Sequence, residues 1–273
     1  MNVDQANMRR AIALAMRGRG RVEPNPMVGC VIAREGRVIA EGHHAYFGGP
    51  HAEPAALAGA AEDVAGATAW VTLEPCCHSH AGKKTPPCAP RLIAAKIGRV
   101  VVGCLDPSPQ VAGQGVRMLR QAGLDVEVGV LDAECHQLVA PYLARVLHKR
   151  PYFTLKWAQS ADGRIAAGGG RRVQISSPES QMLTHLLRGR SDAILVGVRT
   201  AMADDPLLTV RLVAATRPLI RAVLDTHLRL SPLSRLVRTA REATTVVYCG
   251  ADALERAGEL IGAGVEVVGM PLL

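Results

Sequence analysis

The spacing of apolar positions changes between helical and strand periods in the first part of the chain. Residues 4–16 carry apolar side chains at helical spacing, which predicts a helix with Asp4 as its N-cap and Gly18 as its C′ glycine. Apolar runs at 27–33 and 38–41 flank a short turn and predict a β-hairpin. We therefore expect a helix followed by two antiparallel strands.

Short buried strands then alternate with helices up to residue 147. Buried strands that are joined by helices are typical of a parallel sheet covered on both faces, so this part of the chain predicts an α/β sandwich. The predicted strands are 69–73, 100–104 and 126–130, and the predicted helices are 51–61, 89–97, 116–122 and 132–147.

A polar, helix-breaking stretch from His148 to Pro151 predicts a domain boundary, with one domain at 1–148 and another at 149–273. The second domain again alternates strands with helices. Its predicted strands are 152–157, 193–197, 219–224, 244–248 and 265–268, and its predicted helices are 178–188 and 251–261.

Composition narrows the class of protein. The 273 residues are 48% hydrophobic, which is enough for a sizeable core. No apolar run approaches the ~20 residues of a membrane-spanning helix and no secretory signal is recognisable, so we expect a cytoplasmic protein.

The net charge of +8 favours an anionic partner, but the eight aromatic residues are few and scattered. Because single-strand and RNA binders need aromatic stacking platforms, we expect a small phosphorylated ligand and no nucleic acid.

Three of the seven cysteines lie within thirteen residues, which in a reducing compartment indicates metal binding before disulfides. His51, Cys76 and Cys88 form a ligand set suited to zinc, and three protein ligands leave a fourth position for water. Glu53 is the candidate proton shuttle. We expect His51 and Glu53 in the first turn of one helix, and we expect N–H groups at the start of another helix to stabilise the Cys88 thiolate.

Two other interpretations of this cluster are open. A fourth ligand from Cys77, His78 or His80 would make a closed structural zinc site without activity. A nucleic-acid base deaminase shares the zinc chemistry, but it usually has only two residues between its cysteines and has aromatic residues around a flipped base. Here eleven residues separate Cys76 from Cys88. The pattern His-x-Glu followed by Pro-Cys favours a catalytic site.

Longer motifs indicate a family. The sequences NPMVGC, PHAE, TLEPC and TPPC lie at 25–30, 50–53, 72–76 and 85–88, and SADGR and ADDP follow at 160–164 and 203–206. Together these motifs resemble the bifunctional deaminase-reductase of riboflavin biosynthesis. The resemblance covers at least residues 4–225, and the long spacing between the two cysteine motifs is itself a feature of that family.

The resemblance implies a cytidine-deaminase-like α/β/α sandwich followed by a dihydrofolate-reductase-like α/β domain, together forming a homo-oligomer. It implies a zinc-dependent hydrolysis of the exocyclic amine of a diamino-ribosylamino-pyrimidinone 5′-phosphate, and an NADPH-dependent reduction of the ribose to ribityl. By matching position, it implies zinc ligands His51, Cys76 and Cys88 with Glu53 as the catalytic residue, substrate contacts at Asn25, His44, His80, Lys83, Arg188, Leu208 and Arg211, and NADPH contacts at Ala158, Thr200 and Asp204.

The chain departs from the family pattern at three places. A longer loop after Cys76 adds Cys77 as a rival zinc ligand, and we prefer Cys76 because the two residues before it match the family. Gln174 replaces an aromatic residue and Arg172 replaces a small hydroxyl residue on the expected nicotinamide side. Family reductase domains continue with a further strand and a glycine-rich phosphate loop. We therefore expect a working deaminase joined to a C-terminally incomplete reductase domain that binds NADPH weakly.

Overall fold

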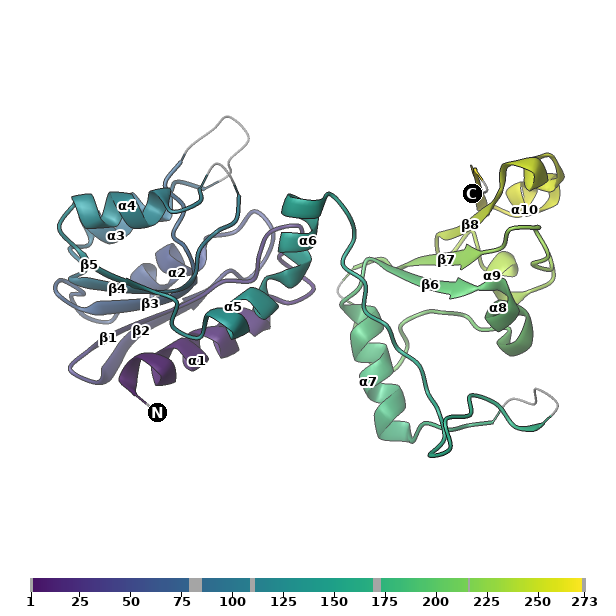
Figure 1. Ribbon diagram of the computed structural model, residues 1–273, viewed down its shortest axis with the longest axis horizontal. Helices are drawn as coiled ribbons and strands as arrows, with labels where there is room; N and C mark the ends of the chain where they lie inside the picture. The colour runs from purple at the N-terminus through teal and green to yellow at the C-terminus, as the bar shows by residue number, and fades with distance from the viewer. Residues whose placement is uncertain (1, 79–84, 109–110, 169–172, 216, 272–273) are drawn as a thin grey trace. The chain divides into compact units, whose positions relative to one another are not determined.

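The computed structural model describes residues 2–78, 85–108, 111–168, 173–215 and 217–271. The chain divides into two compact units, Met1–Thr154 and Leu155–Leu273, called unit 1 and unit 2 below (Figure 1). Among the described residues, no helix is long and apolar enough to cross a lipid bilayer.

The strands of unit 1 are β1 (Gly29–Arg34), β2 (Arg37–His43), β3 (Thr68–Leu73), β4 (Arg99–Cys104) and β5 (Asp125–Val128). They form one sheet in the order β2-β1-β3-β4-β5. β1 pairs antiparallel with β2 and β3, whereas β3, β4 and β5 run parallel because helices connect them. The turn from β1 to β2 places Glu35 at φ 49° and Gly36 at φ 79°, as a type I′ turn requires. The predicted hairpin is confirmed.

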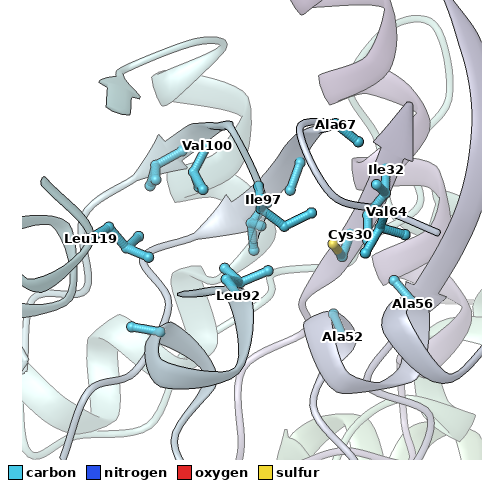
Figure 2. Close-up of a cluster of buried hydrophobic side chains, with 14 of the residues drawn as sticks. Cys30, Ile32, Ala52, Ala56, Val64, Ala67, Leu92, Ile97, Val100 and Leu119 are labelled. Atoms are coloured by element: carbon cyan, nitrogen blue, oxygen red, sulfur yellow. The ribbon is translucent and has the colours of Figure 1, made fainter. Parts of the chain in front are cut away.

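The helices of unit 1 are α1 (Val3–Ala15), a 3₁₀ turn η1 (Met16–Gly18), α2 (Ala52–Ala58), α3 (Cys88–Ala94), α4 (Gln114–Gln121), α5 (Asp132–Leu138) and α6 (Ala140–His148). On one face of the sheet, α2, α3 and α4 bury side chains such as Ala52, Leu92 and Leu119 (Figure 2). On the other face, α1 and α5 bury Met8 and Cys135. Helices on both faces confirm the predicted α/β/α sandwich.

The first helix differs from its prediction at its start. Its N-cap is Asn2, whose side chain accepts a hydrogen bond from the Gln5 N–H at 2.8 Å. Asp4 lies in the first turn, where it accepts a hydrogen bond from the Trp70 indole at 2.8 Å and pairs with Arg99 at 2.9 Å. The Asp4 carboxylate therefore ties the helix to the sheet instead of capping it.

Two other helix ends also differ. α1 ends at its C-cap Met16, and Gly18 is required for another reason, because a Cβ there would lie 2.4 Å from the His44 carbonyl oxygen. The helix predicted over 132–147 is divided at Val139 into α5 and α6. Pro141 explains the division, since it has no N–H to donate and its ring would clash with the carbonyl one turn earlier.

Unit 2 contains the strands β6 (Ala193–Gly197), β7 (Ile220–Leu224), β8 (Thr245–Gly250) and β9 (Glu266–Met270), which form a parallel sheet in that order. Its helices are α7 (Pro178–Gly189), α8 (Val198–Asp204), α9 (Arg235–Arg238), η3 (Ala251–Arg256) and α10 (Gly258–Gly262). The helices α8 and α9 were not predicted. α9 has only four residues, about one turn, which is too few to show a helical period.

Two predictions for the second predicted domain are wrong. Residues 152–157 lie outside every helix and strand, and Phe153, Leu155 and Trp157 are 68%, 82% and 66% exposed. Alternating apolar residues predict only a side-chain pattern, whereas a strand also needs a neighbouring backbone for its N–H and C=O groups. The helix predicted over 251–261 is divided into η3 and α10, with Gly258, a weak helix former, at the division.

Candidate functional site

The structure brings the three predicted zinc ligands together. The ligand atoms of His51, Cys76 and Cys88 all lie within 4.8 Å of one another. Nδ1 of His51 is 3.6 Å from Sγ of Cys76 and 3.3 Å from Sγ of Cys88. Zinc bonds of ordinary length in a tetrahedral site would separate such a nitrogen and sulfur by about 3.6 Å. The donor set and its spacing therefore fit a zinc ion.

Helix starts carry two of the three ligands. His51 is the N-cap of α2, and Cys88 is the first residue of α3. The N–H groups of Cys88 and Ala89 donate to the Cys76 carbonyl at 2.9 and 3.0 Å, which holds the two cysteines side by side. The prediction that these groups stabilise the Cys88 thiolate is wrong, because the Cys76 carbonyl takes both, and the Cys88 N–H also lies 3.4 Å from Sγ of Cys76.

Glu53 lies in the first turn of α2, as predicted, and its side chain is buried. Burial and the neighbouring Cys76 sulfur raise the pKa of Glu53 to about 7. The pKa of Cys88 is raised as well, chiefly by its hydrogen bond with Cys76 and by burial. Cys88 and Glu53 are buried, and His51 and Cys76 are half-buried. Such a cluster favours a cation among its members, since a cation stabilises their deprotonated forms.

The predicted substrate residue His44 lies beside the ligand His51, and a second one, Asn25, contacts His44. Nδ1 of His44 is 2.8 Å from the Pro50 carbonyl oxygen, and Nε2 of His44 is 3.2 Å from Nδ2 of Asn25. A carbonyl can only accept, so Nδ1 carries the proton and Nε2 of the neutral ring accepts from the Asn25 amide. This leaves the Asn25 amide oxygen for another donor. The His44 and His51 rings meet edge to face, with centroids 5.5 Å apart.

Cys77, the rival ligand, is half-buried and packs against the apolar cluster beneath α2, α3 and α4. In the part of the chain that the structure describes, His51, Cys76 and Cys88 form the only cluster of three or more His, Cys, Asp or Glu side chains that could hold a metal ion. The predicted substrate residues His80 and Lys83 lie outside the described residues.

Sequence reasoning gave no role to two residues that support this site. Glu74 is buried and accepts hydrogen bonds from the backbone N–H groups of Asp106, Gly113 and Val116 at 3.2, 2.9 and 3.1 Å. Glu74 directly follows a buried strand, and this position is the feature of the sequence that could have indicated a role for it. The second residue is Thr85, whose hydroxyl lies 3.0 Å from Nε2 of His51.

Unit 2 gathers its three predicted substrate residues around one loop. Nη1 of Arg188 donates to the Thr209 carbonyl at 3.3 Å, and Nη1 of Arg211 donates to the Thr209 hydroxyl at 3.0 Å. The His185 imidazole accepts from the Arg211 N–H at 3.0 Å, and the buried Leu208 has a φ of 53°. Burial and Arg211 lower the pKa of Arg188. Within the described residues, no carboxylate pairs with either guanidinium, so this cluster suits an anion.

The predicted NADPH residues occupy two places in unit 2. Thr200 and Asp204 lie four residues apart on α8, which directly follows β6. Ala158 itself lies in neither a helix nor a strand. Gln174, one of the two departures from the family, donates to the Ser176 carbonyl at 2.8 Å, and Arg172, the other, lies outside the described residues.

The fold and the site define a zinc-binding deaminase domain joined to a second α/β domain. Residues 1–104 match the family model for the cytidine and deoxycytidylate deaminase zinc-binding region, and residues 151–271 match that for the RibD C-terminal domain. The riboflavin biosynthesis protein RibD of Actinobacillus pleuropneumoniae is 44% identical over 96% of this chain and 68% of its own length. The corresponding protein of Aquifex aeolicus is 43% identical over 97% of this chain and 73% of its own length.

Solved structures agree with this assignment. A diaminohydroxyphosphoribosylaminopyrimidine deaminase/5-amino-6-(5-phosphoribosylamino)uracil reductase from Thermotoga maritima aligns with a TM-score of 0.81 and 36% identity, over 98% of this chain and 81% of that one. RibD of Acinetobacter baumannii aligns with a TM-score of 0.82 and 38% identity, over 99% of this chain and 75% of that one. The chain belongs to the RibD family of riboflavin biosynthesis, a family of deaminase-reductases with zinc and NADPH as cofactors. The predicted family and fold class are confirmed.

Proposed function

We propose that unit 1 hydrolyses the exocyclic amine on carbon 2 of 2,5-diamino-6-ribosylamino-4(3H)-pyrimidinone 5′-phosphate and releases ammonia. His51, Cys76 and Cys88 hold the zinc ion, and Glu53 is the catalytic residue. The observation that carries this proposal is the convergence of these three ligand atoms within 4.8 Å beside a buried carboxyl group.

Zinc held by three protein ligands supplies a water molecule whose pKa is lowered to about 7. The Glu53 carboxylate accepts a proton from the attacking water and delivers it to the exocyclic nitrogen. The carbon–nitrogen bond then breaks and ammonia leaves, while the new hydroxyl on carbon 2 passes its proton to the adjacent ring nitrogen and becomes a carbonyl. Proton transfer by a positioned side chain typically contributes about 10²- to 10⁴-fold to the rate. Burial of Glu53 at the start of α2 keeps bulk water away from this proton.

Asn25 and His44 bind and orient the pyrimidine ring. The bond from His44 to the Pro50 carbonyl holds the imidazole, and Nε2 of the imidazole holds the Asn25 amide. The free Asn25 oxygen then accepts from an N–H group of the substrate. His80 and Lys83 complete the substrate contacts in this proposal.

Unit 2 supplies the second reaction of the family, an NADPH-dependent reduction of the ribose. Arg188, Leu208 and Arg211 bind the substrate, and the two guanidinium groups suit its phosphate. Ala158, Thr200 and Asp204 contact NADPH. We place the boundary between the two domains at 148/149, and we propose a cytoplasmic homo-oligomer that acts on a small phosphorylated pyrimidine.

An ammonia-release assay tests the function of unit 1. The zinc-loaded chain should release one ammonia per molecule of the diaminopyrimidinone phosphate, and it should leave cytosine and adenine in tRNA unchanged. Release from tRNA would favour the nucleic-acid deaminase instead. A chain that binds zinc and releases ammonia from neither substrate would favour a zinc-stabilised module without activity.

A further inference from the structure

Both nitrogens of the His51 imidazole have contacts. Nδ1 faces the sulfur atoms of Cys76 and Cys88, and Nε2 lies 3.0 Å from the Thr85 hydroxyl oxygen. An imidazole that gives its Nδ1 lone pair to a metal carries its proton on Nε2. When zinc is bound, the Thr85 oxygen is therefore the acceptor and the His51 ring is the donor.

We propose that Thr85 is a positioning residue of the metal site, whose hydroxyl holds His51 in the tautomer and orientation that direct Nδ1 toward the two sulfur atoms. The inference rests on the proposed zinc site and assigns a further residue to it. Metal-binding histidines usually donate their other N–H to an acceptor, and loss of that acceptor typically weakens metal binding about 10- to 100-fold.

The chain around Thr85 makes this contact rigid. Thr85 is half-buried, and only Pro86 and Pro87 separate it from Cys88. Each proline ring fixes φ near −65°, and Pro87 has φ −63° and ψ 147° as the N-cap of α3. One stiff segment therefore carries both a ligand and the group that orients another ligand.

The hydroxyl matters most in the metal-bound state. Without metal, a hydroxyl can donate to Nε2 or accept from it, so either tautomer of His51 keeps a hydrogen bond. With a metal ion on Nδ1, the Thr85 hydroxyl can only accept the hydrogen bond from Nε2. Removal of the hydroxyl then takes the Thr85 acceptor away from the half-buried His51 ring, which destabilises the metal-bound state more than the metal-free fold.

Three variants of the full chain test this inference. Thr85→Val keeps the shape of the side chain and removes the hydroxyl, whereas Thr85→Ser keeps the hydroxyl. Thr68→Val, at the start of β3, controls for the exchange of threonine for valine. The zinc dissociation constant is measured by competition with a chromophoric chelator, and the stability of each metal-free protein is measured by urea unfolding.

We expect Thr85→Val to raise the zinc dissociation constant by about 10- to 100-fold, while Thr85→Ser and Thr68→Val stay close to the unchanged protein. The metal-free proteins should unfold at similar urea concentrations. Unchanged zinc affinity in Thr85→Val, or equal losses in Thr85→Val and Thr85→Ser, would overturn the role of Thr85 alone. If the unchanged protein bound no zinc, the proposed function would fail together with it.

Discussion

Cys76 and Cys77 are neighbours in sequence, yet the structure gives them different surroundings. Cys76 shares its carbonyl with the first two N–H groups of α3, whereas Cys77 packs against apolar side chains. Cys88→Ala should therefore lose most of its bound zinc, while Cys77→Ala should retain one zinc per chain. Atomic absorption on the purified variants measures this. Loss of zinc from Cys77→Ala would show that Cys77 is a ligand and that the wrong one of the two neighbouring cysteines is assigned.

Asp4 gives the protein a pH-dependent contribution to stability. Its hydrogen bond with Arg99 lowers the pKa of Asp4 below 3.8 in the folded state. The contribution is therefore present above the unfolded pKa and is lost as the pH falls through the folded pKa. Asp4→Asn should lower the free energy of unfolding by about 1–3 kcal/mol near neutral pH, and the difference should shrink in acid. Urea unfolding over a pH series measures it, and a difference independent of pH would contradict this account.

At the scale of elements, α2 lies so close to β2 that only glycine fits between them. A Cβ on Gly42 would lie 2.3 Å from the Ala56 nitrogen and 2.4 Å from the Ala52 carbonyl oxygen. Gly42→Ala should displace the helix that carries His51 and Glu53, destabilise the fold by about 1–3 kcal/mol and weaken zinc binding.

Gly262→Ala is a suitable control for this prediction, because the added Cβ meets nothing within 4 Å. Chemical unfolding and chelator competition on both variants make the comparison. A Gly42→Ala protein with normal stability and normal zinc affinity would show that α2 tolerates displacement.

Pattern and motif predicted most of unit 1, because its strands and helices carry clear periods and two of the three candidate ligands lie at helix starts. They gave Asp4 as the N-cap where the structure has Asn2, because Asp4 is held by Trp70 and Arg99, which are distant in sequence. Pattern and motif also could not show whether residues 152–157 pair with a neighbouring strand. The contact between Thr85 and His51 was equally hidden, because it depends on how two segments approach in space.

The whole molecule consists of two compact units, and a residue of one unit tests whether the site depends on the other. Arg221 is fully buried on β7, where its guanidinium donates to the carbonyls of Leu207, Thr239 and Ala243, among other acceptors. Arg221→Lys keeps the charge and loses the branched donor, so several buried acceptors lose their partner. Unit 2 should lose at least about 2 kcal/mol of stability.

Zinc content and ammonia release should stay unchanged in Arg221→Lys, because every residue of the proposed deaminase site lies in unit 1. Calorimetry combined with metal analysis checks both halves of this prediction. Loss of zinc along with the stability of unit 2 would show that the site depends on both units.

In the proposed function, Glu53 moves the proton while His51, Cys76 and Cys88 hold the metal. The most direct measurement compares zinc content and ammonia release from the diaminopyrimidinone phosphate in the unchanged chain and in Glu53→Gln, whose amide has the same shape and cannot accept the proton. The account predicts one zinc per chain in both proteins and a rate at least about 10²-fold lower in Glu53→Gln. An equal rate of ammonia release from the two zinc-loaded proteins would contradict it.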